Sequence, residues 1–144
     1  EGEAIIKAAE HAITYNTPLI IYTSSGGMRM QSSAISLMQL PKTTVGISMV
    51  KDAKLPVINV LCSPTSGGVL ASFGMLADVT LSEPGATLMF SGKRVTAATG
   101  EIMDDSVFTA EEYYRNGFID QIVHRNEQRD NLAQIISILL KRAA

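Results

Sequence analysis

Short unbroken hydrophobic runs alternate with stretches of helical periodicity along most of the chain. Two of these runs, residues 19–23 and 56–61, are typical of strands covered on both faces, and each is followed by a turn of small residues and a helical stretch. Strands that alternate with helices favour parallel pairing, so the pattern predicts an α/β fold with a largely parallel sheet. Further short strands are predicted at residues 79–81, 87–90 and 119–123.

Stretches of helical periodicity separate these runs. The stretch over residues 30–52 is predicted to kink or split at Pro41, because proline lacks a backbone N–H and clashes with the preceding turn. Thr109 is predicted to cap a later helix, with Glu112 completing a capping box and Gly117 ending the helix. The predicted helices lie at residues 3–15, 30–52, 69–76, 93–98 and 109–116, and in a C-terminal stretch with an apolar stripe of Leu132, Ile135, Ile136, Leu139 and Leu140.

Composition narrows the class of protein. The chain has 144 residues, and we expect one domain over residues 1–144. Hydrophobic residues make up 46% and charged residues 18%, which indicates a packed fold rather than disorder. The net charge of −2 comes without a basic stripe, so nothing favours nucleic acid as a partner. No unbroken apolar stretch of about 18 residues occurs, so we expect a cytoplasmic protein with no membrane span.

Two glycine pairs are the most informative chemical feature. Gly26-Gly27 and Gly67-Gly68 each follow a predicted strand and precede a helical stretch. Glycine lets the backbone approach a ligand closely, and two such corners side by side would aim N–H groups at one oxygen, as in an oxyanion hole. Paired glycines also serve close packing of a helix on a strand, and the pattern alone leaves both interpretations open. Neither pair leads into the Gly-Lys-Ser/Thr sequence of a phosphate loop.

Conventional catalytic groups are scarce. His11 is predicted to be a partly buried structural residue, and His124 an exposed one. Cys62 is the single cysteine, which excludes a four-cysteine zinc site formed by this chain alone, and packing is favoured over a nucleophilic role. No Ser-His-Asp pattern or metal-ligand spacing stands out, so no metal is expected. Chemistry built on backbone donors suits a thioester enolate, with the substrate or a cofactor handling the proton.

Several ordered motifs resemble one family. Gly26-Gly27-Met28-Arg29-Met30-Gln31 is similar to the Gly-Gly-Ala-Arg-Met-Gln segment of carboxyltransferase β subunits of bacterial acetyl-CoA carboxylase, which are biotin-dependent carboxyltransferases. Pro64-Thr65-Ser66-Gly67-Gly68-Val69 resembles that family's Pro-Thr-x-Gly-Gly-Val. Further blocks follow in the same order, so the resemblance covers nearly the whole chain. They are Ser36-Leu37-Met38-Gln39, Ala71-Ser72-Phe73, Glu83-Pro84 and Gly117-Phe118-Ile119-Asp120.

The resemblance implies a ClpP/crotonase-like α/β fold of repeated strand–strand–helix units, without the family's N-terminal zinc ribbon and first strands. It also implies an activity: the carboxyl group of carboxybiotin passes to acetyl-CoA, giving malonyl-CoA. Released biotin, held on a carrier protein, would accept the proton, and the CoA thioester would be the substrate. The residues that the resemblance assigns to catalysis are Gly26, Gly27, Gly67 and Gly68, and those that it assigns to substrate binding are Met28, Arg29, Thr65, Ser66 and Arg94.

The resemblance further implies partners: a carboxyltransferase α subunit and a biotin carboxyl carrier protein, in a hetero-oligomer of the α2β2 type. Met28 departs from the family's alanine beside the first glycine pair, and its bulk is expected to narrow or reshape the acyl pocket. Three alternatives remain open from the residues. They are a related acyl-CoA decarboxylase or carboxyltransferase, a hydratase-isomerase that would need a carboxylate near the thioester, and a non-catalytic assembly subunit of the same fold.

Overall fold

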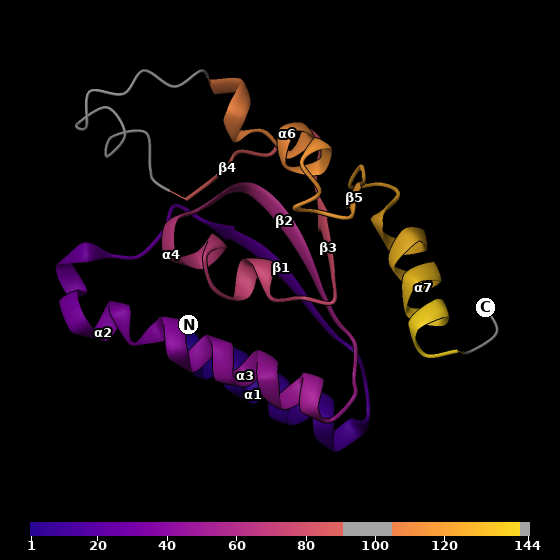
Figure 1. The fold of residues 1–144 in the computed structure, drawn as a ribbon. Helices are drawn as coiled ribbons and strands as arrows, with labels where there is room; N and C mark the ends of the chain where they lie inside the picture. Colours follow the sequence, from indigo (N-terminus) through magenta and orange to yellow (C-terminus); the bar gives the residue numbers. More distant parts are fainter. Residues whose placement is uncertain (91–104, 142–144) are drawn as a thin grey trace.

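The structure of the chain is a computed structural model, which describes residues 1–90 and 105–141. Helices and strands alternate along it, as the hydrophobic pattern predicts (Figure 1). The helix predicted over residues 93–98 lies outside the described residues. The strands are β1 (Leu19–Ser25), β2 (Val57–Ser66), β3 (Val79–Ser82), β4 (Leu88–Met89) and β5 (Gln121–Ile122). The helices are α1 (Gly2–Tyr15), α2 (Ser33–Leu37), α3 (Gln39–Asp52), α4 (Gly67–Leu70), α6 (Ala110–Arg115) and α7 (Gln128–Leu139), and the 3-10 turns are η1 (Met30–Ser32), η2 (Phe73–Met75) and η3 (Asp105–Phe108).

The named strands form one sheet in the order β1–β2–β3–β5, and β4 pairs with the distal end of β2. β1 and β2 pair in one register from Leu19–Val57 to Thr23–Leu61, and the register then shifts so that Ser25 pairs with Thr65. β2 aligns Ile58 with Val79 of β3. Each of these strand pairs is parallel. The predicted α/β fold with a largely parallel sheet is therefore confirmed.

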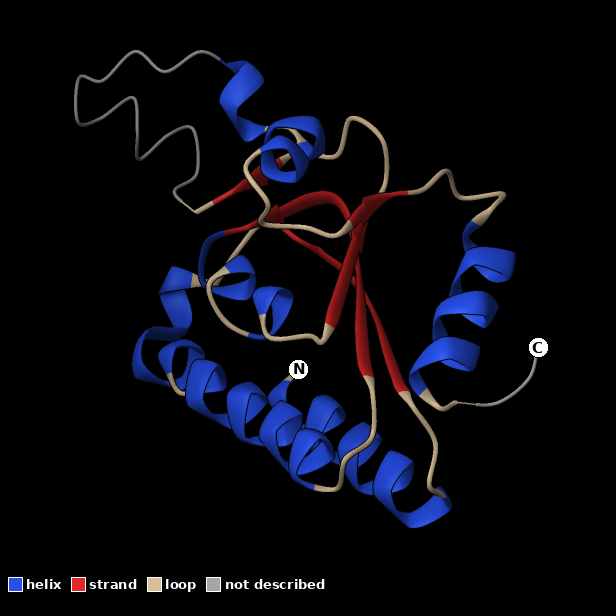
Figure 2. Ribbon diagram, turned by 45° about the vertical axis from the view of Figure 1, so that its right-hand side comes forward, coloured by secondary structure: helices blue, strands red, loops and turns tan. Residues whose placement is uncertain are grey.

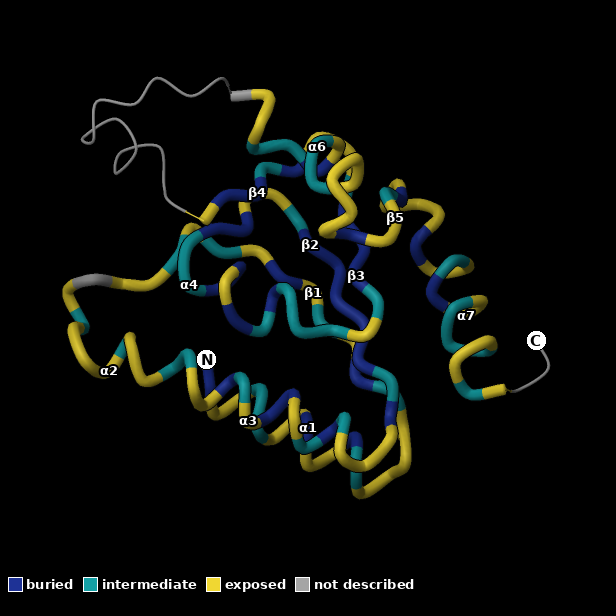
Figure 3. Tube along the Cα trace, in the orientation of Figure 1, coloured by how far each residue is buried: buried dark blue, intermediate teal, exposed yellow. Residues whose placement is uncertain are grey.

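Helices cover both faces of the sheet (Figure 2). α1 and α3 lie side by side on one face, and α7 lies on the other. Because successive residues of a strand point to opposite faces, Val57 packs beneath α1 and α3, whereas Ile58 packs with Leu132 of α7. Both β2 side chains are fully buried, and most of the β2 trace has the colour of buried residues in Figure 3. Burial on both faces explains the unbroken hydrophobic run of this strand.

β1 is covered on one face only. It lies at the edge of the sheet, and α7 packs over β2 and β3. Leu19 is therefore buried under the α1–α3 layer, whereas Ile20 and Tyr22 on the other face are 38% and 56% exposed. The prediction that residues 19–23 are covered on both faces is wrong, because a hydrophobic run does not reveal whether its strand is central or at an edge.

Residues 30–52 are split, as predicted, but the break precedes the proline. α2 and α3 meet at Met38, and Pro41 lies in the first turn of α3. The missing N–H of proline costs nothing there, because first-turn amides have no intrahelical acceptor. α3 then packs closely on α1: a Cβ placed on Gly46 would lie 3.2 Å from Cγ2 of Ile5.

The helix predicted over residues 69–76 is shorter and begins earlier. α4 starts at Gly67 and ends at Leu70, and the 3-10 turn η2 follows. The hydroxyl of Ser72 donates to the backbone oxygen of Gly68 over 2.6 Å. Such a side-chain bond competes with the regular helical ladder, which accounts for the interruption.

The cap of α6 forms as predicted, but the capping box does not. The Thr109 hydroxyl accepts the backbone N–H of Glu112 over 3.3 Å. The Glu112 carboxylate contacts Arg115 and Asn116 instead of the Thr109 N–H, which donates to the backbone oxygen of Ser106. Gly117 follows the helix with a φ of +75°, as expected of a residue that ends a helix.

Candidate active site

The two glycine corners meet backbone to backbone. Gly27 and Gly67 have φ angles of +104° and +62°, in the region that favours glycine. A Cβ placed on Gly67 would lie only 3.3 Å from the Cα of Gly27. The pairing of Ser25 with Thr65 at the ends of β1 and β2 sets this approach. The structure thus brings together the turns at Gly26-Gly27 and Gly67-Gly68, which lie about 40 positions apart in the sequence.

The residues before the second corner belong to β2 rather than to a turn. Residues 63–66 were expected to form part of a small-residue turn, but β2 continues through Ser66. The strand is extended by pairing with both β1 and β4, and the Thr65 N–H donates to the backbone oxygen of Thr87 over 2.9 Å. The second corner therefore begins at Gly67, where α4 starts.

Thr65 and Ser66 are buried and hold the corners in place. The Thr65 hydroxyl lies 2.9 Å from the backbone oxygen of Thr23 and 2.7 Å from that of Cys62. The Ser66 hydroxyl donates to the backbone oxygen of Ser25 over 3.3 Å. Both hydroxyls therefore face backbone acceptors, and the two residues join the end of β1 to the end of β2.

A cavity of about 380 Å³ lies beside the corners. One side of it comes from the segment that leaves the first corner and from α2 and α3, and the other comes from α4 and η2. Gly27, Met28, Arg29 and Gly68 line it, so the structure brings four of the predicted site residues together. Arg94 lies outside the described residues. The remaining lining residues are Glu1, Ser32, Ile35, Ser36, Gln39, Leu40, Thr43, Val69, Ser72 and Phe73.

Backbone amides at the first corner differ in their partners. The Gly27 N–H donates to the Ser25 hydroxyl over 3.2 Å, so an incoming oxygen would have to displace that hydroxyl. Within residues 1–90 and 105–141, no hydrogen bond engages the N–H of Met28. Ser66, the residue before α4, makes no side-chain bond to the first-turn amides of that helix. The Gly27 amide is thus held by a serine, whereas the Met28 amide has no hydrogen-bond partner among the described residues.

The cavity contains few ionisable groups. Among its described lining residues, Glu1 and Arg29 carry charges. The backbone oxygen of Arg29 accepts the Ser36 hydroxyl over 2.7 Å and the Ser32 N–H over 3.1 Å. These bonds fix the segment between the first corner and α2. Apart from Glu1 and Arg29, the lining residues that the structure describes contribute hydroxyl, amide and apolar groups.

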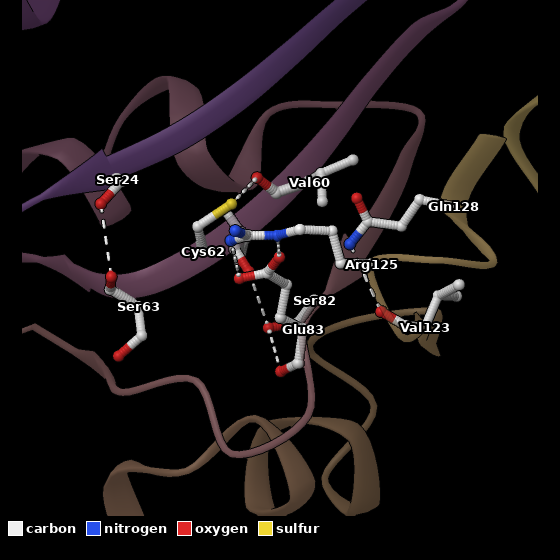
Figure 4. A network of polar contacts seen from close by, with 10 residues as sticks. Ser24, Val60, Cys62, Ser63, Ser82, Glu83, Val123, Arg125 and Gln128 are labelled. Atoms are coloured by element: carbon white, nitrogen blue, oxygen red, sulfur yellow. Dashed lines mark hydrogen bonds and ion pairs between the residues drawn. The ribbon is translucent and has the colours of Figure 1, made fainter.

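The carboxylate of Glu83 lies in a different network, beside α7 (Figure 4). Arg125 donates to its two oxygens over 2.7 and 3.0 Å, and this pairing lowers the pKa of Glu83. Arg125 lines a separate groove with Ile20 and Tyr22 on the α7 side of the sheet. Cys62 belongs to the same network, and burial raises the pKa of its thiol, which favours the neutral form.

Neither histidine belongs to the cavity. His11 is exposed and stacks on Tyr15 with ring centroids 4.4 Å apart, so the prediction that it is partly buried is wrong. His124 is exposed, as predicted. Over the described residues, no group of three or more His, Cys, Asp or Glu side chains is arranged to hold a metal ion. The described helices include none that is both long and apolar enough to cross a membrane.

Two lining residues, Gln39 and Phe73, stand in blocks that resemble the family but were not among the predicted site residues. Gln39 accepts the Gly2 N–H over 2.9 Å and donates to the backbone oxygen of Ile35 over 3.1 Å, which ties α3 to α1 and α2. Phe73 reaches the cavity from η2. These positions lie on helices and 3-10 turns whose orientation relative to the glycine corners is set only by tertiary packing.

Comparisons with known proteins agree with this architecture. The sequence profile of the carboxyl transferase domain matches residues 1–143. A protein of Sinorhizobium medicae named acetyl-coenzyme A carboxylase carboxyl transferase subunit beta is 48% identical over 144 residues, covering 99% of this chain and 47% of the relative. A protein of the same name from Liberibacter asiaticus is 48% identical and covers 97% and 50%, respectively. The chain thus spans about half the length of the curated relatives that it matches.

Solved structures support the fold. A transcarboxylase 12S structure with hydrolysed methylmalonyl-coenzyme A bound has a TM-score of 0.78 and 24% identity, covering 94% of this chain and 27% of that one. An enoyl-CoA hydratase/carnitine racemase from Magnetospirillum magneticum has a TM-score of 0.66 and 12% identity, covering 99% and 65%. At such low identity the likeness concerns the fold alone, and the predicted crotonase fold is confirmed.

Proposed function

The chain belongs to the carboxyl transferase domain family, and from this membership we propose that it is the core of the β subunit of a biotin-dependent acetyl-CoA carboxyltransferase. In this proposal the subunit transfers a carboxyl group from carboxybiotin to acetyl-CoA and produces malonyl-CoA. It works with a carboxyltransferase α subunit and a biotin carboxyl carrier protein, in an α2β2-type assembly in the cytoplasm. The names of the relatives at 48% identity support this choice of substrate and partners.

The observation that carries the proposal is the meeting of the two glycine corners beside a cavity. When the acetyl group loses its α-proton, negative charge develops on the thioester oxygen. Backbone amides near Gly27 and Gly68 would hold that oxygen, and one such donor is typically worth about 3–4 kcal/mol of transition-state stabilisation.

The cavity also suits a reaction in which biotin is the second reactant. Carboxybiotin supplies the carboxyl group and, once this has left, a nitrogen that accepts the α-proton. Among the described lining residues only Glu1 and Arg29 are ionisable, so a cofactor that takes the proton complements the groups present. The lining includes the hydroxyl of Ser32 and the apolar side chains of Leu40 and Phe73, a mixed surface that suits a polar ring on an aliphatic arm.

The hydratase-isomerase alternative receives no support from the position of Glu83. A hydratase needs a carboxylate within hydrogen-bond reach of the acyl chain. Glu83 is paired with Arg125 on the α7 side of the sheet and does not line the cavity. Glu101, the other glutamate in the middle of the chain, lies outside the described residues.

The test is a carboxyl-transfer assay on the full-length β subunit with its α partner. Malonyl-CoA and biocytin are supplied, and decarboxylation of malonyl-CoA with formation of carboxybiocytin is measured. The proposal expects saturable turnover, which Gly27→Ala should reduce at least 100-fold because a side chain cannot adopt this backbone geometry without strain. Absence of turnover at saturating substrate, with CoA still bound in a titration, would reject the enzyme and leave the assembly-subunit alternative.

A further inference from the structure

Met28 and Gly68 form a tight steric pair inside the cavity. A Cβ placed on Gly68 would lie 3.1 Å from both Cγ and Sδ of Met28 and 3.2 Å from its Cε. The thioether of Met28 therefore lies along the Cα of Gly68, in the space that any other residue type at position 68 would fill. The contact joins the segment after the first corner to the start of α4.

The pair lies where the acyl group of a bound thioester would be. Met28 directly follows Gly27, and both Met28 and Gly68 line the cavity beside the meeting point of the corners. A thioester whose oxygen is held by the corner amides must place its acyl carbons within a few ångströms of those amides. The side chain of Met28 is thus the bulky group next to the reacting end of the substrate.

We propose that Met28 limits the acyl group of the substrate to two carbons, and that Gly68 makes this possible by leaving room for the thioether. The inference rests on the proposed function and specifies which CoA thioesters that same site accepts. An additional methylene on the acyl group would compete with Met28 for the space over Gly68. One methylene in an apolar pocket is worth about 10–200-fold in kcat/KM, a range that steric discrimination by one side chain can supply.

Flexibility of the side chain is the main physical argument against such a limit, because methionine has three rotatable bonds. Met28 is 37% exposed, so one part of it faces solvent. The other part is confined by Gly68 on α4, with Val69 and Phe73 also lining the cavity on that side. A longer acyl chain must therefore displace a packed thioether, which raises its transition-state free energy relative to acetyl.

The experiment measures kcat/KM for acetyl-CoA and propionyl-CoA with the full-length β subunit, its α partner and carboxybiotin on the carrier protein. Met28→Ala removes three heavy atoms next to Gly68 and is expected to raise the propionyl-to-acetyl ratio at least 10-fold. Met28→Leu keeps most of the bulk and should hold the ratio within about 3-fold of the wild-type value, since a leucine-for-methionine exchange conserves volume. Met38→Ala is the matched control, because Met38 is 61% exposed and does not line the cavity.

Gly68→Ala tests the second member of the pair. Its methyl group should force Met28 into the cavity and reduce turnover of acetyl-CoA, and Gly68→Ala combined with Met28→Ala should recover at least part of that loss. An unchanged propionyl-to-acetyl ratio in Met28→Ala, with normal acetyl-CoA turnover, would overturn the inference and leave the proposed function standing. If the wild-type complex turns over neither thioester, the proposed function fails. In that case the dissociation constants of acetyl-CoA and propionyl-CoA are measured for wild type and for Met28→Ala. The inference expects the preference for propionyl-CoA over acetyl-CoA in binding to rise at least 10-fold in Met28→Ala, and a smaller change would overturn it.

Discussion

The side-chain amide nitrogen of Asn59 donates to the backbone oxygen of Phe73 over 3.0 Å, and this bond ties the centre of the sheet to the wall of the cavity. Asn59 is fully buried in β2. Its amide nitrogen also reaches the backbone oxygen of Gly74 over 3.1 Å, and its amide oxygen accepts the Thr23 hydroxyl over 2.7 Å. One polar side chain therefore links β1, β2 and η2.

Replacing Asn59 by alanine should destabilise the fold and disturb the cavity. The substitution leaves two backbone oxygens and the Thr23 hydroxyl without their partner, and a buried group left unsatisfied costs about 1–3 kcal/mol. We expect a loss of about 2–4 kcal/mol in the free energy of unfolding, measured by urea denaturation. Asn126→Ala removes an exposed asparagine and should change stability by less than about 0.5 kcal/mol. Equal stability of the two variants would contradict the linking role of Asn59.

Gly67 and Gly85 allow backbone strain to be separated from close contact. Both have positive φ angles, +62° and +65°, and alanine at such an angle costs about 1–2 kcal/mol. A Cβ on Gly67 would lie 3.3 Å from the Gly27 Cα, whereas a Cβ on Gly85 would meet nothing within 4 Å. Gly67→Ala should therefore lower both stability and carboxyl transfer, the latter at least 10-fold, and Gly85→Ala should lower stability alone. Thermal melts and the biocytin assay measure the two effects. Loss of activity in Gly85→Ala would show that strain, and not contact between the corners, matters.

The pair of Glu83 and Arg125 should make stability depend on pH in the acid range. The hydrogen bonds from Arg125 lower the pKa of Glu83 below its usual value of 4.5. A carboxyl whose pKa is lower in the folded state contributes stability above about pH 4.5, and this contribution is lost as the pH falls through the folded-state pKa. In Arg125→Gln the loss of stability should therefore begin at a higher pH, because burial then acts on Glu83 without its partner.

The melting temperature between pH 7 and pH 3 measures this effect. Arg125 is 79% exposed, so added salt should shrink the difference between wild type and Arg125→Gln at neutral pH. Arg129→Gln is the control, since it removes a nearby positive charge from the same groove without touching Glu83. Superimposable pH profiles for wild type and Arg125→Gln would mean that the pair contributes nothing to folding.

The Thr109 cap should contribute measurably to the stability of the region around α6. Its hydroxyl oxygen accepts the Glu112 N–H over 3.3 Å, and the same N–H also donates to the backbone oxygen of Thr109 over 3.1 Å. Thr109→Ala should cost about 1 kcal/mol, within the range of about 0.5–2 kcal/mol typical of such caps, and Thr109→Ser should retain most of it. Urea denaturation of the two variants is the measurement. A serine variant as unstable as the alanine variant would assign the effect to the lost methyl group.

The sequence by itself determined the features that depend on neighbouring positions. The hydrophobic run of residues 56–61 indicates a buried strand, and the structure buries residues 57–61, the polar Asn59 among them. Thr109 and Gly117 bound α6 because capping and left-handed backbone conformations are properties of single residues. The glycine pairs likewise predicted the two turns, because a positive φ is a conformation that glycine adopts without strain.

Only the tertiary structure decided what those corners contact. The position of α7 over β2 and β3 left one face of β1 exposed, although the sequence of β1 resembles that of a buried strand. The register of β1 on β2 placed Gly67 against Gly27, and the packing of α4 placed Gly68 under Met28. Contacts between residues about 40 positions apart depend on strand register and helix packing, which the whole core sets together and which no local pattern encodes.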